Sequence, residues 1–180
     1  MQLRLDQLSA HLQKAGSTLK PIYTLYGDEA LLAQEAADTI RAAARAAGYT
    51  ERQVHTVSGA HFDWSSLLGS ASEMSLFGDR QLIEIRIPSG KPGKDGGQAL
   101  QDYVTHLSPD NLTLITLPKL DWATQKASWV SMLLQAAVYI DIPLIERAAL
   151  PNWIGQRLGA QGQSADRQSL EFIADRSEER

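Results

Sequence analysis

The stretch Ile22-Tyr23-Thr24-Leu25-Tyr26-Gly27 decides the fold. Its β-branched and aromatic residues favour a strand, and the glycine ends the run. An alanine-rich segment of helical length follows from Ala30 to Ala47. Gly48 then stands at the position where helices often end on a glycine. The order strand, turn, helix predicts the opening unit of an α/β domain.

Four further strand candidates continue this alternation along the chain. They are the β-branched or strongly apolar runs 53–57, 81–88, 112–118 and 138–143, and helix-length segments separate them. Parallel neighbours need long crossovers, and these are nearly always right-handed. The sequence therefore predicts a three-layer, mostly parallel, five-stranded α/β sheet in which 81–88 is a central strand.

The segments between these runs give more local predictions. Helically spaced leucines predict one amphipathic helix over about 5–16, and Asp63 is a plausible N-cap for the helix that follows it. Glycine, proline and lysine over 89–97 are typical of a mobile loop. A single helix is expected over 122–137.

The pattern divides the chain into two domains. Residues 1–143 form the predicted α/β domain, and residues 144–180 show helical patterns only. Pro151 suits the start of one helix in the second part, and Ser164 is a candidate cap for the next. Two helices bury too little surface for a core of their own, so we expect a fragment of a longer polypeptide.

Composition excludes several classes of protein. The 180 residues carry 17 Lys+Arg against 21 Asp+Glu, with a net charge of -4 and no cysteine. Disulfides, thiolate catalysis and cysteine metal sites are therefore excluded. The mild acidity argues against a broad nucleic-acid surface, so any DNA contact should be local or shared with partners. With neither a signal peptide nor a membrane-spanning run, a cytoplasmic location and no membrane contact are expected.

A degenerate phosphate loop follows the first strand. A P-loop needs Gly-x-x-x-x-Gly-Lys-Ser/Thr, but reading from Gly27 the chain has Leu32 for the second glycine, Ala33 for the lysine and Gln34 for the hydroxyl residue. The architecture is present and the phosphate-binding residues are missing. We therefore expect neither ATP binding at this turn nor nucleotide hydrolysis.

Asp28 and Glu29 place two negative charges where a triphosphate would sit. Their simplest role is to complement the dipole of the following helix. A phospho-acceptor receiver domain also has acids after its first strand, but it needs an aspartate after its third. This chain has Ile87-Pro88-Ser89 there, so that hypothesis fails.

Other candidate catalytic or ligand-binding groups are weak. His55, His61 and Asp63 lie close in sequence but lack a metal-binding spacing. Lys91 and Lys94 could touch an acidic partner or a DNA phosphate, although solvated loop lysines explain them more simply. The sequence thus predicts no catalytic residue, no metal site, no cofactor and no small-molecule substrate.

One pair of apolar residues is a candidate site for binding a protein partner. Leu76 and Phe77 are adjacent at the end of a predicted helix, just before Gly78. Adjacent helical residues do not share a face, so both could project from the helix tip into a partner's pocket. Alternatively both belong to the core, which periodicity alone favours.

Taken together, the motifs resemble those of the delta subunit family of the bacterial DNA polymerase III clamp loader, over essentially the whole chain. The resemblance rests on Tyr26-Gly27-Asp28-Glu29, Asp63-Trp64, Met74-Ser75-Leu76-Phe77 before Arg80, Leu114-Ile115-Thr116 ending in Pro118-Lys119-Leu120, Trp129, and Leu150-Pro151-x-Trp153-Ile154.

The resemblance implies an AAA+-like α/β domain without ATPase activity and the start of a small helical lid domain, with the C-terminal oligomerisation domain absent. It implies a non-catalytic subunit of a DNA-directed DNA polymerase holoenzyme (a nucleotidyltransferase complex) that binds and opens the beta sliding clamp, so that the clamp can be loaded on primed DNA. The implied partners are that clamp, the gamma/tau and delta prime subunits, and primed DNA within the complex.

The same resemblance assigns the clamp-binding residues. Leu76 and Phe77 would insert into the hydrophobic pocket of the clamp, and Met74 and Ser75 would flank them. Glu73 departs from the neutral residue that some members of the family carry there.

Two alternatives remain open on the residues alone. A nucleotide-binding α/β enzyme, such as a kinase-like transferase with an atypical phosphate loop, predicts thermal stabilisation by ATP and Mg²⁺. A structural scaffold predicts that Leu76 and Phe77 are buried, so that replacing them mainly lowers stability.

Overall fold

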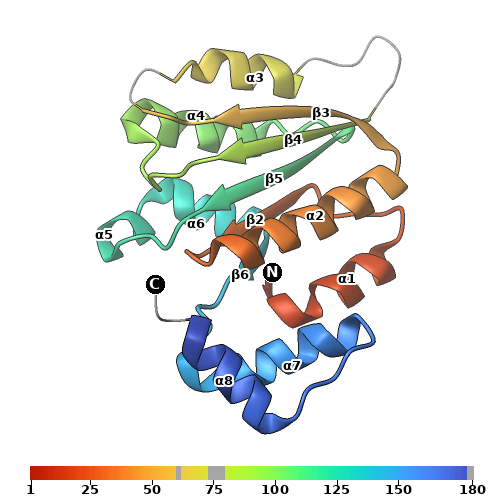
Figure 1. Ribbon diagram of the computed structural model, residues 1–180. Coiled ribbons are helices and arrows are strands. Elements are labelled where there is room, and N and C mark those ends of the chain that lie inside the picture. The colour runs from red at the N-terminus through yellow and green to blue at the C-terminus, as the bar shows by residue number, and fades with distance from the viewer. Residues whose placement is uncertain (60–61, 73–79, 178–180) are drawn as a thin grey trace. The chain divides into compact units, whose positions relative to one another are not determined.

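The computed structural model describes residues 1–59, 62–72 and 80–177. The chain forms two compact units, Met1–Pro143 and Leu144–Arg180. The first unit is a sheet with helices on both faces (Figure 1). The second contains a short 3-10 turn, η2 (Arg147–Ala149), and two helices, α7 (Leu150–Ala160) and α8 (Arg167–Ser177).

The sheet has six strands in the order β1-β6-β2-β5-β4-β3, and every pairing is parallel. The predicted parallel three-layer α/β fold is confirmed, but the predicted strand count of five is wrong. In chain order the strands are β1 (Gln2–Arg4), β2 (Ile22–Tyr26), β3 (Tyr49–Thr56), β4 (Arg80–Arg86), β5 (Asn111–Leu117) and β6 (Val138–Asp141).

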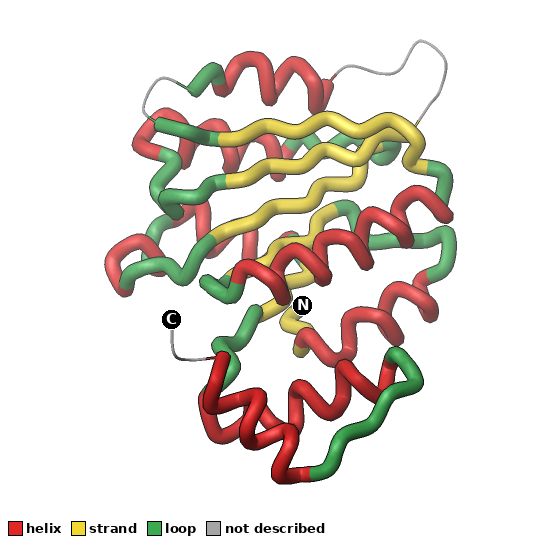
Figure 2. Tube along the Cα trace, in the orientation of Figure 1, coloured by secondary structure: helices red, strands yellow, loops and turns green. Residues whose placement is uncertain are grey.

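The helices divide between the two faces of the sheet (Figure 2). One face carries α1 (Leu8–Ala15) and α2 (Ala30–Ala46). The other carries α3 (Trp64–Ser72), α4 (Gly93–Thr105) and α6 (Ser128–Ala136), while α5 (Trp122–Gln125) is a single turn after β5. This division follows from right-handed crossovers, which run in opposite directions on the two faces.

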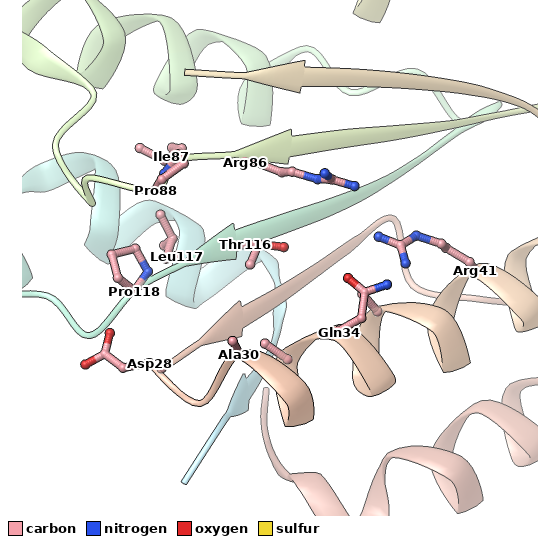
Figure 3. Close-up of a pocket in the computed structure, with 13 residues that line it drawn as sticks. Asp28, Ala30, Gln34, Arg41, Arg86, Ile87, Pro88, Thr116, Leu117 and Pro118 are labelled. Atoms are coloured by element: carbon pink, nitrogen blue, oxygen red, sulfur yellow. The ribbon is translucent and has the colours of Figure 1, made fainter. Parts of the chain in front are cut away.

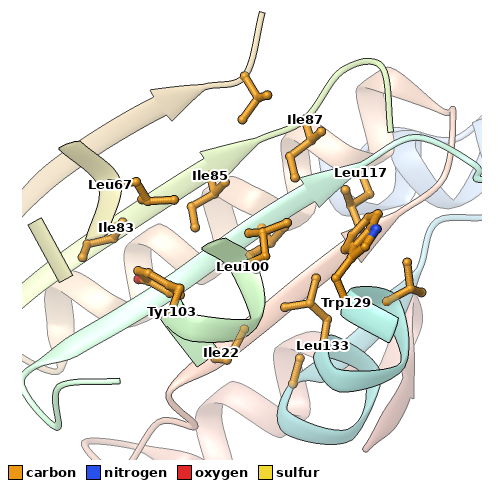
Figure 4. Packing of buried hydrophobic residues seen from close by; sticks show 14 of the residues in the cluster. Ile22, Leu67, Ile83, Ile85, Ile87, Leu100, Tyr103, Leu117, Trp129 and Leu133 are labelled. Atoms are coloured by element: carbon orange, nitrogen blue, oxygen red, sulfur yellow. The ribbon is translucent and has the colours of Figure 1, made fainter. Parts of the chain in front are cut away.

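The main core lies between the strands and α3, α4 and α6 (Figure 4). Its largest side chains include Leu67, Leu100, Tyr103 and Trp129, which pack on the isoleucines of β4. The Tyr103 hydroxyl is buried and hydrogen-bonds the Thr113 hydroxyl at 2.7 Å, so the core's phenol is paired.

The N-terminal helix begins later than predicted, at Leu8 instead of about residue 5, and a strand that the sequence did not predict precedes it. Residues Gln2–Arg4 form β1, which pairs with β6, and a 3-10 turn, η1 (Leu5–Gln7), precedes α1. The strand is three residues long, and its partner is more than 130 residues away in sequence. Local periodicity carries no signal for such a pairing.

The predicted loop over 89–97 is also wrong in its second half, because α4 begins at Gly93. Gly96 and Gly97 are buried there against two tryptophans. A Cβ on Gly96 would overlap the Trp64 ring, and one on Gly97 would lie 3.1 Å from Trp129. These glycines therefore permit close packing of α4 on its neighbours rather than chain flexibility.

Two further helix predictions need correction. The helix expected over 122–137 is two helices, because Ala127 takes an extended conformation between α5 and α6. In the second unit, Asp166 rather than Ser164 caps α8, since its carboxylate accepts the Ser169 N–H at 2.7 Å.

Candidate functional site at the carboxyl ends of the strands

The four predicted clamp-binding residues, Met74, Ser75, Leu76 and Phe77, lie outside the described residues. The helix that precedes them in the chain, α3, is held by an N-cap and by a buried side chain. The Asp63 carboxylate accepts the N–H groups of Ser65 and Ser66 at 3.0 and 3.2 Å, which confirms Asp63 as the cap of α3. Leu67 of this helix is fully buried in the core.

The first turn and the loop after β5 interlock through three hydrogen bonds. The Gly27 N–H donates to the Leu117 carbonyl at 3.1 Å, and the Lys119 N–H donates to the Asp28 carboxylate at 2.8 Å. The Leu120 N–H donates to the Tyr26 hydroxyl at 3.1 Å. Two motifs about 90 residues apart in sequence therefore form one structural unit at the carboxyl edge of the sheet.

Gly27 has a structural reason to be glycine. Its φ is +148°, and a Cβ there would overlap the backbone carbonyl oxygen of Ile142. The Ile142 N–H also donates to the Tyr26 carbonyl at 2.8 Å, so the two backbones are held close together. The glycine allows this approach of backbone to backbone, a role that needs no phosphate.

The structure separates the residues of the degenerate phosphate loop. Leu32 is buried in the core, whereas Gly27, Asp28, Ala33 and Gln34 line a pocket. Glu29 is the N-cap residue of α2 and makes no side-chain cap bond.

This pocket lies between α2 and the carboxyl halves of β4 and β5 (Figure 3). Its volume is about 350 Å³. One end is apolar and includes Ile87, Pro88 and Pro118. The other end carries the guanidinium groups of Arg41 and Arg86. The pocket is thus cationic at one end, and its other end is mostly apolar with the Asp28 carboxylate at the turn.

A buried carboxylate organises the cationic end. Glu84, in the middle of β4, is 1% exposed. Its Oε1 accepts Arg41 Nε at 2.7 Å and Arg52 Nε at 2.6 Å, while its Oε2 accepts Nη2 of both Arg41 and Arg86 at 3.0 Å. Arg41 also pairs with the exposed Asp38. We call Glu84 and its three arginines the Glu84 cluster.

The cluster keeps Glu84 ionised. Burial alone would raise the pKa of this carboxyl, but hydrogen bonds from Arg41, Arg52 and Arg86 outweigh burial and lower its pKa to about 2. Sequence reasoning missed the cluster. The available signal was a glutamate within a strand expected to be covered on both faces, since a charge so placed needs partners.

The histidine candidates do not form a site. His61 lies outside the described residues, and the His55 ring meets the Phe62 ring edge-on. Burial lowers the pKa of His55. Within residues 1–59, 62–72 and 80–177, no three His, Asp or Glu side chains are arranged to hold a metal ion.

The two loop lysines differ in their contacts. Lys91 pairs with the exposed Asp121 at 3.4 Å, and Lys94 lies in the first turn of α4.

Across the described part of the chain, no helix is both long enough and apolar enough to cross a membrane.

Comparisons with known proteins agree on one family. The family model for DNA polymerase III, delta subunit, matches residues 23–143. The delta subunit of Escherichia coli DNA polymerase III is 30% identical over 152 residues, covering 84% of this chain and 43% of that protein. The Haemophilus influenzae delta subunit is 28% identical over 173 residues, covering 93% and 48%. The chain therefore spans less than half the length of these relatives.

Solved structures agree on the fold. The Bacillus subtilis DNA clamp loader delta protein superposes with a TM-score of 0.67 at 17% identity, covering 94% of this chain and 51% of that one. Domain III of the Thermotoga maritima replication initiation protein DnaA gives 0.53 at 12% identity, covering 94% and 75%. The matched family model covers most of the α/β unit, and on that ground the chain belongs to the DNA polymerase III delta-subunit family.

Proposed function

We propose that this chain is the N-terminal part of a clamp-loader delta subunit, which binds and opens the beta sliding clamp so that it can be loaded on primed DNA. Membership of the delta-subunit family is the observation that carries the proposal. The partners would be the clamp, the gamma/tau and delta prime subunits, and primed DNA within the complex. Residues 1–143 would be the AAA+-like domain, and residues 144–180 the start of its helical lid.

In this proposal Leu76 and Phe77 enter the hydrophobic pocket of the clamp, and Met74 and Ser75 flank them. An opener must bind the open ring more tightly than the closed one, because only a difference in affinity shifts a two-state equilibrium. The fixed start of α3 supports this role. The Asp63 cap and the buried Leu67 anchor α3, the helix that precedes Met74 in the chain, to the core of the α/β unit.

The proposal also assigns no ATPase activity to the chain. Leu32 occupies the core at the position of the second glycine of a P-loop, and the Asp28 carboxylate stands at the turn where a triphosphate would lie. Both features oppose phosphate binding by the turn itself. ATP hydrolysis would then belong to other subunits of the complex.

Truncating the apolar pair should abolish clamp binding. We expect Phe77→Ala alone to weaken binding to a purified bacterial sliding clamp by about 2 kcal/mol or more, roughly thirtyfold, as for a central aromatic residue of an interface. Leu76→Ala/Phe77→Ala should bind too weakly to measure. Isothermal titration calorimetry with the cognate clamp tests this, and circular dichroism verifies folding.

Leu31→Ala is the matched control, because Leu31 is a 49% exposed leucine on α2 and is not one of the proposed clamp-binding residues. It should bind the clamp like the wild type. A folded Phe77→Ala protein with wild-type affinity would remove these residues from the interface. A folded wild type that does not bind its cognate clamp would contradict the proposed function.

A further inference from the structure

The Glu84 cluster contains more positive charge than its own acids balance. A carboxylate offers about four acceptor positions, and Arg41, Arg52 and Arg86 fill four through the bonds described above. Three guanidinium groups thus share one buried carboxylate and the exposed Asp38. With Asp38 counted, the three guanidinium groups exceed the two carboxylates by one positive charge, and Glu84 has no acceptor position left.

Arg86 has N–H groups that do not donate to Glu84. Within the described ranges, its one side-chain hydrogen bond uses Nη2. A guanidinium has five N–H donors, so Arg86 can offer further N–H groups to a ligand. Its side chain is 42% exposed and lines the pocket between α2, β4 and β5. The excess charge therefore faces a cavity rather than the protein interior.

Other donors line the same cavity from separate elements. Arg41 and Gln34 come from α2, Arg86 comes from β4, and the Thr116 hydroxyl comes from β5 (Figure 3). Donors on several sides suit a tetrahedral oxyanion, whose oxygens point in different directions, better than a planar carboxylate, which one guanidinium can satisfy.

We propose that this pocket binds a single phosphate group, with Arg86 as its main ligand and Arg41, Gln34 and Thr116 as further donors. This inference goes beyond the proposed clamp-loading function and does not depend on it. It also differs from a P-loop, because the donors are side chains of one helix and two strands, whereas a P-loop combines backbone amides of the turn with the lysine that follows them.

The charges around the pocket favour one phosphate over an extended nucleic-acid backbone. Asp28 lines the turn end of the pocket, and Asp38 lies exposed beside Arg41. A duplex laid across this surface would bring several phosphates near these carboxylates, which would repel them. A single terminal phosphate, on a free ion, a nucleotide or a DNA end, could lie against the arginines without bringing further phosphates near these carboxylates.

Isothermal titration with inorganic phosphate, at constant ionic strength, tests the proposal directly. We expect saturable binding to the wild-type chain that Arg86→Gln weakens about tenfold or more, as for the loss of a charge-assisted hydrogen bond. Thr116→Val should weaken it less. Arg52→Gln is the matched control, since Arg52 also gives one bond to Glu84 and is similarly exposed, but does not line the pocket.

Further arms identify the source of the phosphate. A single-stranded oligonucleotide with a 5′-phosphate should compete with inorganic phosphate, and the same oligonucleotide without it should not. Acetate that binds as tightly as phosphate would overturn the assignment to phosphate. Equal weakening by Arg52→Gln and Arg86→Gln, or no saturable binding to the wild type, would overturn the site. Clamp binding should be unchanged in Arg86→Gln, so failure here is distinguishable from failure of the proposed function.

Discussion

Replacing Glu84 with glutamine is expected to lower the free energy of unfolding by about 3 kcal/mol, because it leaves three guanidinium groups without their shared anion. The carboxylate is 1% exposed and links α2 to β3 and β4 through Arg41, Arg52 and Arg86. Equilibrium urea denaturation at neutral pH measures the change. The α/β unit should remain folded in the absence of denaturant, since its hydrophobic core is untouched.

The pH dependence of this loss separates charge from packing. Hydrogen bonds in the cluster lower the pKa of Glu84 from 4.5 to about 2. A carboxyl group whose pKa is lower in the folded state than in the unfolded state stabilises the fold at any pH above the unfolded-state pKa. That contribution is lost as the pH falls from about 4.5 towards 2. The gap in unfolding free energy between wild type and Glu84→Gln should therefore shrink as the pH is lowered through this range.

Asp38→Asn is the control for this variant. Asp38 also contacts Arg41, but its side chain is 60% exposed, so solvent replaces the lost interaction. Its effect on stability should be far smaller than that of Glu84→Gln. Equal effects of the two variants, or a gap for Glu84→Gln that does not change with pH, would show that the cluster is not held by the buried charge.

Gly27→Ala is expected to cost about 3 kcal/mol or more of unfolding free energy. The alanine would have to keep a φ of +148°, and its methyl group would overlap the Ile142 carbonyl oxygen, which belongs to the backbone and cannot rotate away. The adjoining bond from Ile142 N–H to the Tyr26 carbonyl should weaken with it. Thermal and urea denaturation, followed by far-UV circular dichroism, measure the loss.

Gly48→Ala measures the stability cost of a positive φ alone, without steric overlap. Gly48 also has a positive φ, +91°, but nothing lies within 4 Å of the position of its Cβ. This variant should lose about 1 kcal/mol, the usual cost of a left-handed conformation for an L residue. If Gly27→Ala loses no more stability than Gly48→Ala, the close approach of Gly27 to Ile142 does not explain the glycine.

Local patterns were sufficient for most of the sheet. The strands around 22–26, 81–86 and 112–117 were predictable because each is a short, dense apolar run, and such runs fold as covered strands wherever a sheet forms. Gly48 likewise follows the end of α2, as predicted, and its φ is positive. The family resemblance rested on motifs of this local kind, and the comparisons confirm it.

Predictions failed where the deciding contact is remote in sequence. The glycines at 96 and 97 were assigned to a loop, yet they lie in α4 because Trp64 and Trp129 pack against them. Gln2–Arg4 became a strand because β6 offers an unpaired edge. In each case a tertiary contact outweighs the preference of the local sequence, since packing energies exceed propensity differences of less than about 1 kcal/mol per residue.

The sequence by itself determined the parallel α/β architecture, the degenerate phosphate loop and the family, because all three are written in short runs of neighbouring residues. Only the tertiary structure decided what the charged residues do. Arg41 and Arg52 lie 43 and 32 residues from Glu84 along the chain, and no spacing rule predicts that they meet. A carboxylate buried in the middle of β4, between β5 and β3, is stable in its ionised form because these guanidinium groups surround it.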